Sequence, residues 1–178
     1  MPISPTGRTS GGGRGFTLVE LAVVTLLIVM LAAVAVPSFA GFWRASQERN
    51  CAWQLAALAR QAREYAICHA VRVAVEYHEP ERQFRLTAES ESAQVHGDFE
   101  PLALAGAQPV DIPDAVDQVS VSIEGRPADA GVPLVFFPDG QALAAQVVLE
   151  GPQGTWLVNV VPLTGQAKVT QGNAQSQQ

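Results

Sequence analysis

Glu20 is the ionisable residue whose position in the sequence most needs an explanation. It is the one charged residue in an apolar run at 16–36, which reads FTLVELAVVTLLIVMLAAVAV. An acidic side chain near the middle of a bilayer costs about 2.5–3.5 kcal/mol, and less near the surface. This cost favours a cationic partner for Glu20. The alternative is a side chain that reaches back to the lipid headgroups.

The histidines form no catalytic pattern. His69, His78 and His96 lack the spacing of a metalloprotease, and the sequence contains neither a Gly-x-Ser-x-Gly elbow nor a Walker motif. We interpret the three histidines as ordinary surface or core residues. The sequence therefore predicts a protein that is not an enzyme and that carries no cofactor.

Three aspartates recur at a regular interval in the sequence. Asp111, Asp114 and Asp117 occupy every third position, whereas an EF-hand loop takes its ligands from alternate positions. We expect a solvated acidic loop and no metal there, with a calcium site as the alternative.

The run at 16–36 is long and apolar enough to be a membrane-spanning helix. At about 1.5 Å per residue it covers roughly the hydrocarbon core of a bilayer, and it lacks the polar face of a soluble helix. Residues 1–15 carry Arg8 and Arg14 and no acid, which places them in the cytoplasm and the rest of the chain across the membrane. The sequence Ala33-Val34-Ala35 offers the alternative of an ordinary secretory signal that releases a soluble domain.

The composition fits one exported domain attached to this anchor. The chain has 178 residues and a formal net charge of −6, and an acidic domain is a poor general binder of nucleic acids. Cys51 and Cys68 would face an oxidising compartment. On one continuous helix they would lie roughly 25 Å apart, beyond the roughly 7 Å limit for a disulfide, so we expect both to be free.

The region 37–69 predicts an amphipathic continuation of the membrane helix. Pro37 follows the apolar run, where it would bend the helix. Small and apolar residues then recur at helical spacing with polar residues between them. The predicted packing positions are Ala52, Leu55, Leu58, Ala59, Ala62 and Ala66.

The region 70–170 predicts an antiparallel β-sheet domain. Alternating apolar and polar residues indicate a hairpin of strands at 71–77 and 84–88, and further strands at 119–123, 134–137, 146–149, 155–161 and 167–170. Residues 89–116 predict a long loop with at most a short irregular strand, and 124–127 predict a turn. The tail 171–178 is polar and is expected to be disordered. The fold class is α+β, with one long N-terminal helix packed on the sheet.

The N-terminal residues resemble the class III signal of type IV pilins and type II secretion pseudopilins. Arg14-Gly15 directly precedes Phe16, and Thr-Leu-Val-Glu-Leu follows. The resemblance implies that a prepilin peptidase removes the leader 1–15 by cutting between Gly15 and Phe16, and that the new terminus at Phe16 is N-methylated. It also implies that Glu20 meets the cationic N-terminus of a neighbouring subunit during filament assembly. Pilin-like helices commonly kink at a proline placed like Pro37.

A second resemblance lies near the C-terminus. Phe136-Phe137-Pro138-Asp139-Gly140, followed by two strands and a closing Thr-Gly, is similar to the H-type minor pseudopilins of type II secretion, a family shared with the pilus protein FimT. Proline fixes φ in this turn, and glycine permits a positive φ. We expect Asp139 to bond its own backbone rather than to contact a ligand.

The two resemblances together imply a minor pseudopilin near the tip of a periplasmic filament that promotes export of folded proteins across the outer membrane. The chain would be held in the bacterial inner membrane by one span, with its C-terminal domain in the periplasm. The implied partners are other major and minor pseudopilins, the prepilin peptidase, the inner-membrane assembly platform and, as a further expectation, secreted substrates. The alternative is a FimT-like minor type IV pilin used in pilus assembly or DNA uptake. That alternative needs a basic surface, whereas the tail 172–178 has no Lys or Arg.

Overall fold

The computed structural model describes residues 16–90, 99–102, 107–129 and 131–172, with the side chains of 34–40 also left out. The chain divides into two compact units, Met1–Ala40 and Gly41–Gln178, which are described separately. One helix, α1 (Leu18–His69), contributes its first part to the first unit and its remaining turns to the second.

Within the first unit, α1 is helical from Leu18 onward and does not end at Pro37. Among the described residues, no helix combines the length and the apolar composition that crossing a membrane requires. The side chains of 34–36, at the end of the predicted span, and that of Pro37 lie outside the described residues. The predicted kink at Pro37 therefore stays a prediction.

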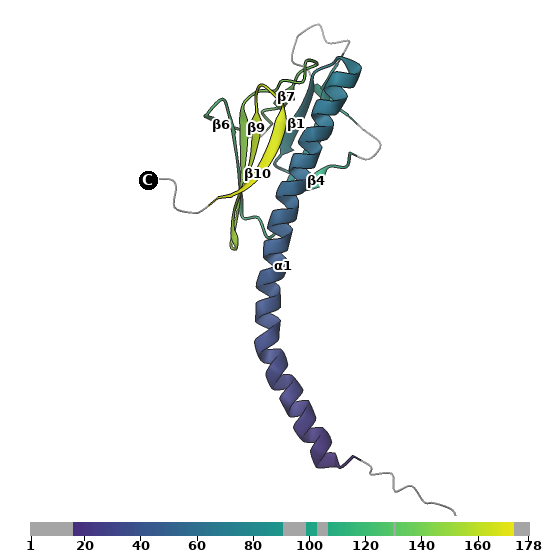
Figure 1. Ribbon diagram of the computed structural model, residues 1–178, viewed down its shortest axis with the longest axis vertical. Coiled ribbons are helices and arrows are strands. Elements are labelled where there is room, and N and C mark those ends of the chain that lie inside the picture. The colour runs from purple at the N-terminus through teal and green to yellow at the C-terminus, as the bar shows by residue number, and fades with distance from the viewer. Residues whose placement is uncertain (1–15, 91–98, 103–106, 130, 173–178) are drawn as a thin grey trace, which may run out of the picture. The chain divides into compact units, whose positions relative to one another are not determined.

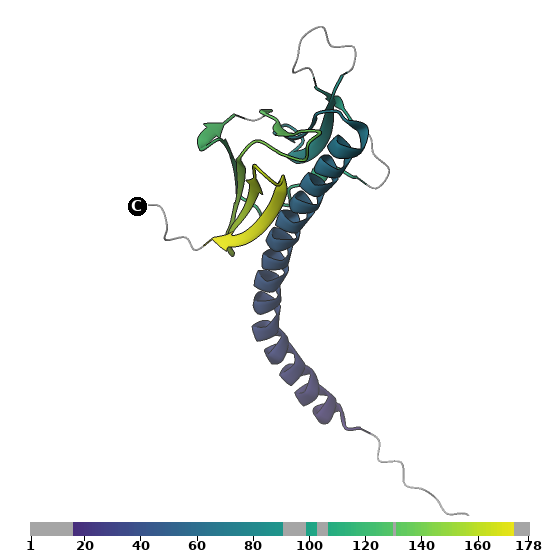
Figure 2. The same ribbon diagram turned by 45° about the horizontal axis from the view of Figure 1, so that its top comes forward.

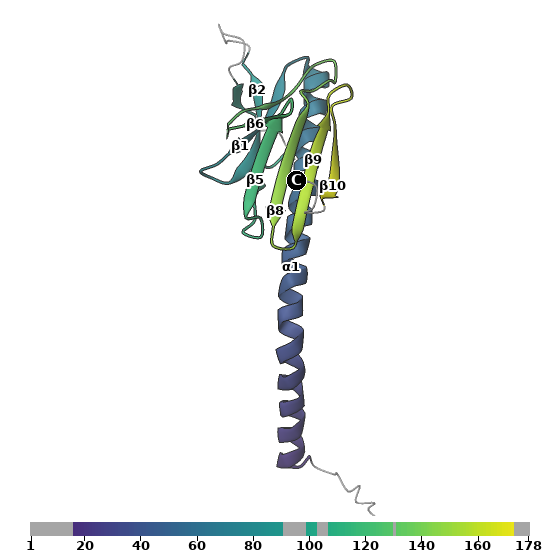
Figure 3. The same cartoon turned by 90° about the vertical axis from the view of Figure 1, so that its left-hand side faces the viewer.

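The second unit contains two antiparallel sheets where the sequence predicted one (Figure 3). The first sheet has the order β3-β2-β1-β7, and β4 also pairs with β2. Its strands are β1 (Val73–His78), β2 (Gln83–Glu89), β3 (Phe99–Pro101), β4 (Val110–Asp111) and β7 (Leu134–Phe136). The second sheet has the order β10-β9-β8-β5-β6. Its strands are β5 (Gln118–Ile123), β6 (Arg126–Ala128), β8 (Ala145–Gly151), β9 (Gly154–Val161) and β10 (Gln166–Gly172).

The core lies between the C-terminal turns of α1 and the two sheets, with β1 and β10 beside the helix (Figures 1 and 2). The predicted packing positions of the helix are all buried. Phe84 of β2 and Phe136 of β7 are the largest side chains with no exposed surface. The α+β fold with a helix packed on antiparallel strands is therefore confirmed.

Three predictions about local structure were incomplete. Residues 89–116 were predicted as a loop with at most a short irregular strand, but they contain the two short strands β3 and β4. Residues 124–127 were predicted as a turn, but the turn consists of Glu124 and Gly125, both with positive φ, and β6 begins at Arg126. Positive φ at both central residues gives the tight hairpin turn that joins β5 to β6, and an edge strand tolerates Pro127. At the other end, β10 extends to Gly172, two residues into the predicted tail.

Candidate functional site

The first turn of α1 holds Glu20 in a capped helix start. The Glu20 backbone N–H donates to Oγ1 of Thr17 at 3.2 Å, and the Leu21 N–H donates to the Thr17 carbonyl at 3.1 Å. Thr17 is therefore the N-cap residue, and a Thr-x-x-Glu spacing is a known signal for such a start. Sequence reasoning missed Thr17, although TLVE carries this signal. Glu20 lies in the first turn of α1, at the positive end of the helix dipole.

The apolar residues around Glu20 have little contact with the rest of the described chain. Phe16 is 79% exposed and Leu18 is 85% exposed, and every described side chain from Phe16 to Ala33 is classed as exposed. Gly15 lies outside the described residues, so the bond predicted to be cut is not described. An apolar surface of this extent needs a covering, which a lipid phase or other apolar helices can supply.

The turn at Phe137–Gly140 is a structural turn. The Gly140 N–H donates to the Phe137 carbonyl at 2.9 Å, and the Gln141 N–H donates to Oδ1 of Asp139 at 3.0 Å. Asp139 thus bonds the nearby backbone, as expected. Pro138 occupies the position of the turn at which a fixed φ is favourable.

Arg63 of α1 contacts this turn and the turn between β9 and β10. Its Nε donates to the Gly140 carbonyl at 3.1 Å. Gly140 has a φ of +82°, and a Cβ there would lie 3.2 Å from the Arg63 guanidinium. Gly165 has a φ of +59°, and a Cβ there would lie 2.5 Å from the Gly140 carbonyl oxygen and 2.9 Å from Cδ of Arg63. Both glycines therefore leave the space that the arginine occupies.

Glu48 is a buried acid that sequence reasoning also missed. It is 1% exposed, and its Oε1 accepts a hydrogen bond from the Gln153 backbone N–H at 3.2 Å. Its Oε2 has no partner among the described residues. Burial is the main cause that raises the pKa of Glu48; the negative charge of Asp117 adds to the rise, and the Gln153 hydrogen bond opposes it. The spacing of Glu48 from Cys51, Ala52 and Leu55 was the available signal that it faces the core.

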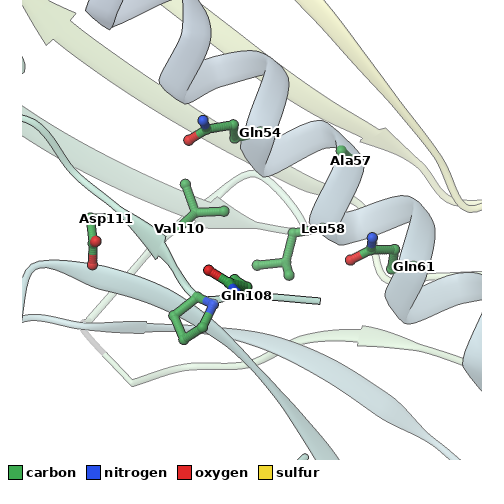
Figure 4. A pocket seen from close by; sticks show the side chains of 8 residues that line it. Gln54, Ala57, Leu58, Gln61, Gln108, Val110 and Asp111 are labelled. Carbon is green, nitrogen blue, oxygen red and sulfur yellow. The ribbon is translucent and has the colours of Figure 1, made fainter. Parts of the chain in front are cut away.

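An open cavity of about 380 Å³ lies between α1 and the segment before β4 (Figure 4). Gln54 and Gln61 project from the helix, and Gln108 and Asp111 come from the opposite side. The apolar side chains of Leu58 and Val110 form part of its lining. Its amides could bind a polar ligand, but no strongly basic or nucleophilic group lines it.

The other candidate ligand residues are dispersed. His69 stacks on Tyr65 with ring centroids 3.8 Å apart, and Nε2 of His78 lies 2.7 Å from a carboxylate oxygen of Glu81. His96 lies outside the described residues. Within the described parts of the chain, no group of three or more His, Cys, Asp and Glu side chains is arranged to hold a metal ion.

Cys51 and Cys68 are both free thiols, as predicted. Cys51 is buried, and Cys68 is exposed near the end of α1. Burial raises the pKa of the Cys51 thiol to about 11. A thiol in that state is a poor nucleophile.

These features define a fold in which an N-terminal helix packs on antiparallel sheets, as in pilin-like proteins. No protein-family profile matches the sequence, and no curated protein matches it. Among solved structures, a crystal structure of the minor pseudopilin EpsH from the type II secretion system of Vibrio cholerae is similar. Its TM-score is 0.58 at 12% identity, covering 73% of this chain and 98% of EpsH. The solution structure of Escherichia coli GspH is also similar, with a TM-score of 0.54 at 14% identity, covering 74% of this chain and 93% of GspH.

A second EpsH structure gives a TM-score of 0.52 at 10% identity, covering 73% of this chain and 99% of that one. The chain therefore has the fold of the minor pseudopilins over most of its length. The resemblance inferred from the Phe136–Gly140 segment is confirmed at the level of the fold.

Proposed function

We propose that the chain is a minor pseudopilin of a type II secretion pseudopilus, which assembles near the tip of a periplasmic filament and promotes export of folded proteins. The observation that carries the proposal is a pilin-like domain together with a capped apolar helix that begins at Leu18, two residues after Phe16, and holds Glu20 in its first turn. The similarity in fold to EpsH, a minor pseudopilin of a type II secretion system, supports it. The chain would act through binding, without a catalytic step.

The N-terminal residues would have separate roles in this function. Cleavage after Gly15 would remove the leader 1–15 and leave Phe16 as a methylated N-terminus. Residues 16–36 would hold the chain in the inner membrane, with the domain from residue 70 onward in the periplasm. Twelve large apolar side chains between Phe16 and Leu31 are exposed, and their burial in lipid or among other pseudopilin helices would be strongly favourable. Glu20 would pair with the N-terminal amine of a neighbouring subunit.

The N-terminus of the mature protein tests this proposal. The full chain is expressed with a prepilin peptidase, and its terminus is determined by mass spectrometry. We expect a methylated Phe16, whereas a start near Val36 would show a discarded signal and would refute the proposal. A second experiment compares Glu20→Ala with Glu100→Ala, a control at an exposed acid of β3. Glu20→Ala should be cleaved normally and recovered at a reduced level with the other pseudopilins, while normal recovery would exclude the assembly role.

The alternative of a minor type IV pilin for DNA uptake has one observation in its favour. Arg44, Arg49 and Arg60 are exposed on α1 and belong to none of the ion pairs found among the described residues. The net charge of −6 opposes this function, because phosphate binding needs clustered cations. A gel-shift assay at moderate salt distinguishes the two functions. A shift with duplex DNA would favour uptake, and no shift is expected for a secretion subunit.

A further inference from the structure

The free edge of the second sheet lies beside arginines of α1. β10 is the last strand in the order of that sheet and pairs with β9 along its whole length. An edge strand offers backbone N–H and C=O groups on its open side to another strand. At the start of β10 an open cavity of about 300 Å³ separates the strand from the helix. Its lining consists of Arg60, Arg63, Glu64, Gly165, Gln166 and Ala167.

The two arginines and Glu64 all line this cavity, so positive charge is in excess there. The ion pairs found among the described residues involve Arg72, His78 and Arg85 as cations, so Arg60 and Arg63 are not among them. Nε of Arg63 is used by the Gly140 carbonyl. Arg60 is exposed and makes no such bond in this part of the chain. A guanidinium is well suited to a carboxylate, because its planar N–H groups can bind both oxygens.

We propose that the β10 edge binds an extended acidic segment of another pilin-like subunit, which adds a strand to the sheet and places a carboxylate against Arg60 and Arg63. The inference rests on the proposed function, because it names the binding surface through which this subunit meets a neighbour. Strand addition supplies affinity through backbone hydrogen bonds, and side-chain contacts supply selectivity. Lys168, the one lysine of the chain, is exposed on β10 and adds a further positive charge along the edge.

The same features favour a protein segment over a nucleic acid. A nucleic acid cannot extend the hydrogen-bond ladder of β10, since it lacks a peptide backbone. Arg60, Arg63 and Lys168 are the cations at this edge, but the whole chain has 17 acids and 11 basic residues. This excess of negative charge disfavours binding of a polyanion such as a nucleic acid. A strand with one or a few carboxylates matches both the length of the edge and its charge.

The inference is tested with a fluorescent seven-residue peptide of alternating Val and Glu, matched to the seven residues of β10. The full chain in non-ionic detergent micelles is titrated, and binding is followed by fluorescence anisotropy. A second peptide carries Gln in place of each Glu. We expect the Glu peptide to bind about tenfold more tightly than the Gln peptide, as the loss of a charge-assisted contact predicts. An equal affinity for the two peptides would overturn the role of the arginines.

Matched variants locate the binding surface. Arg60→Gln should weaken binding of the Glu peptide by about tenfold. Arg49→Gln should leave binding unchanged, because Arg49 is exposed on the same helix but does not line the cavity. Arg63 is not substituted, since it also holds Gly140. Equal losses in the two variants would indicate non-specific attraction and would refute the site.

Hydrogen exchange then separates strand addition from binding elsewhere. The amides of 166–172 should exchange more slowly when the Glu peptide is bound. Binding without this protection would contradict strand addition, and displacement of the peptide by a single-stranded oligonucleotide would identify a nucleic-acid surface instead. Failure of this inference is distinguishable from failure of the proposed function. A chain with a methylated Phe16 that assembles but binds no acidic strand would refute only the inference.

Discussion

Replacement of Glu48 by glutamine should stabilise the second unit at neutral and alkaline pH. Burial raises the pKa of Glu48, so the folded chain holds this proton more tightly than the unfolded chain does. Below the ordinary glutamate pKa of about 4.3, Glu48 is protonated in both states and carries no penalty. As the pH rises through the higher pKa of the folded state, ionisation of the buried carboxyl lowers the free energy of unfolding. Glu48→Gln removes that loss.

The size of the gain in the free energy of unfolding follows from the contacts of the Glu48 carboxyl group. Oε1 of Glu48 accepts from the Gln153 N–H, and a glutamine carbonyl can keep this bond. Oε2 has no partner among the described residues, which costs about 1–3 kcal/mol for a buried acceptor. The Ala115 carbonyl oxygen borders the same site, since a Cβ on Gly151 would lie 2.5 Å from both this oxygen and Oε1 of Glu48. Glutamine places an uncharged NH₂ where Oε2 stands, so no buried negative charge forms at any pH. We therefore expect a gain of about 1–2 kcal/mol at pH 8 and about zero at pH 4.

Urea denaturation of the full chain in non-ionic micelles, followed by tryptophan fluorescence at pH 4, 6 and 8, measures the effect. Glu48→Leu is the matched control. It also removes the charge but leaves the Gln153 N–H without its acceptor, and it should lower the free energy of unfolding by about 1–3 kcal/mol at pH 4. If Glu48→Gln is less stable than the wild type at pH 8, or if its gain is the same at all three pH values, the reasoning fails.

Three further predictions concern the domain. Gly140→Ala should lower the free energy of unfolding, measured by urea denaturation, by about 1–3 kcal/mol. The loss should exceed that of Gly125→Ala, because both glycines have a positive φ but only Gly140 has neighbouring atoms within 4 Å of the added Cβ. Leu55→Ala should cost about 2–5 kcal/mol in the same assay, because the side chain is buried among core residues. A maleimide at pH 7 should label Cys68 in the folded chain and Cys51 only after unfolding, because the Cys51 thiol is buried and has a pKa of about 11. Peptide mass mapping identifies the labelled cysteine.

The elements that the sequence predicted well are those with a strong local period. The helical spacing of Ala52, Leu55 and Leu58 identified the face of α1 that packs on the sheets, and all three are buried. Alternation likewise identified the hairpin of β1 and β2, in which Tyr77 pairs with Phe84. Both patterns depend on residues that are close together along the chain, so the helix face and the hairpin can be predicted from a single sequence.

The division into two sheets was not predictable in this way. β7 pairs with β1, about sixty residues earlier in the chain, rather than with β8, which follows it. Alternation shows which face of a strand is buried, but it does not show which strand lies beside it. The short strands β3 and β4 have two or three residues each, too few for a period to emerge.

A local sequence pattern is equally limited in predicting the function of the candidate site, because that function depends on other molecules. Gly15, Phe16 and Glu20 were identified by resemblance, and their roles depend on a peptidase, a methyl donor and a neighbouring subunit. Those roles stay predictions, whereas the cap at Thr17 is a local contact that the Thr-x-x-Glu spacing could have indicated. Glu48 could have been found as an acid in register with the apolar stripe.

The position of Arg63 explains why the turn at Phe137–Gly140 indicates a fold and not a chemistry. The arginine lies where Gly140 and Gly165 leave room, so the turn before β8 and the turn before β10 both meet the same helix side chain. A sequence with both glycines and a matching helix can dock the helix on the sheets in this way, whatever the filament or substrate. The turn therefore indicates how the helix packs on the sheets. We expect the partner to be selected one helical turn away, at Arg60, which lines the open cavity beside the free edge of β10.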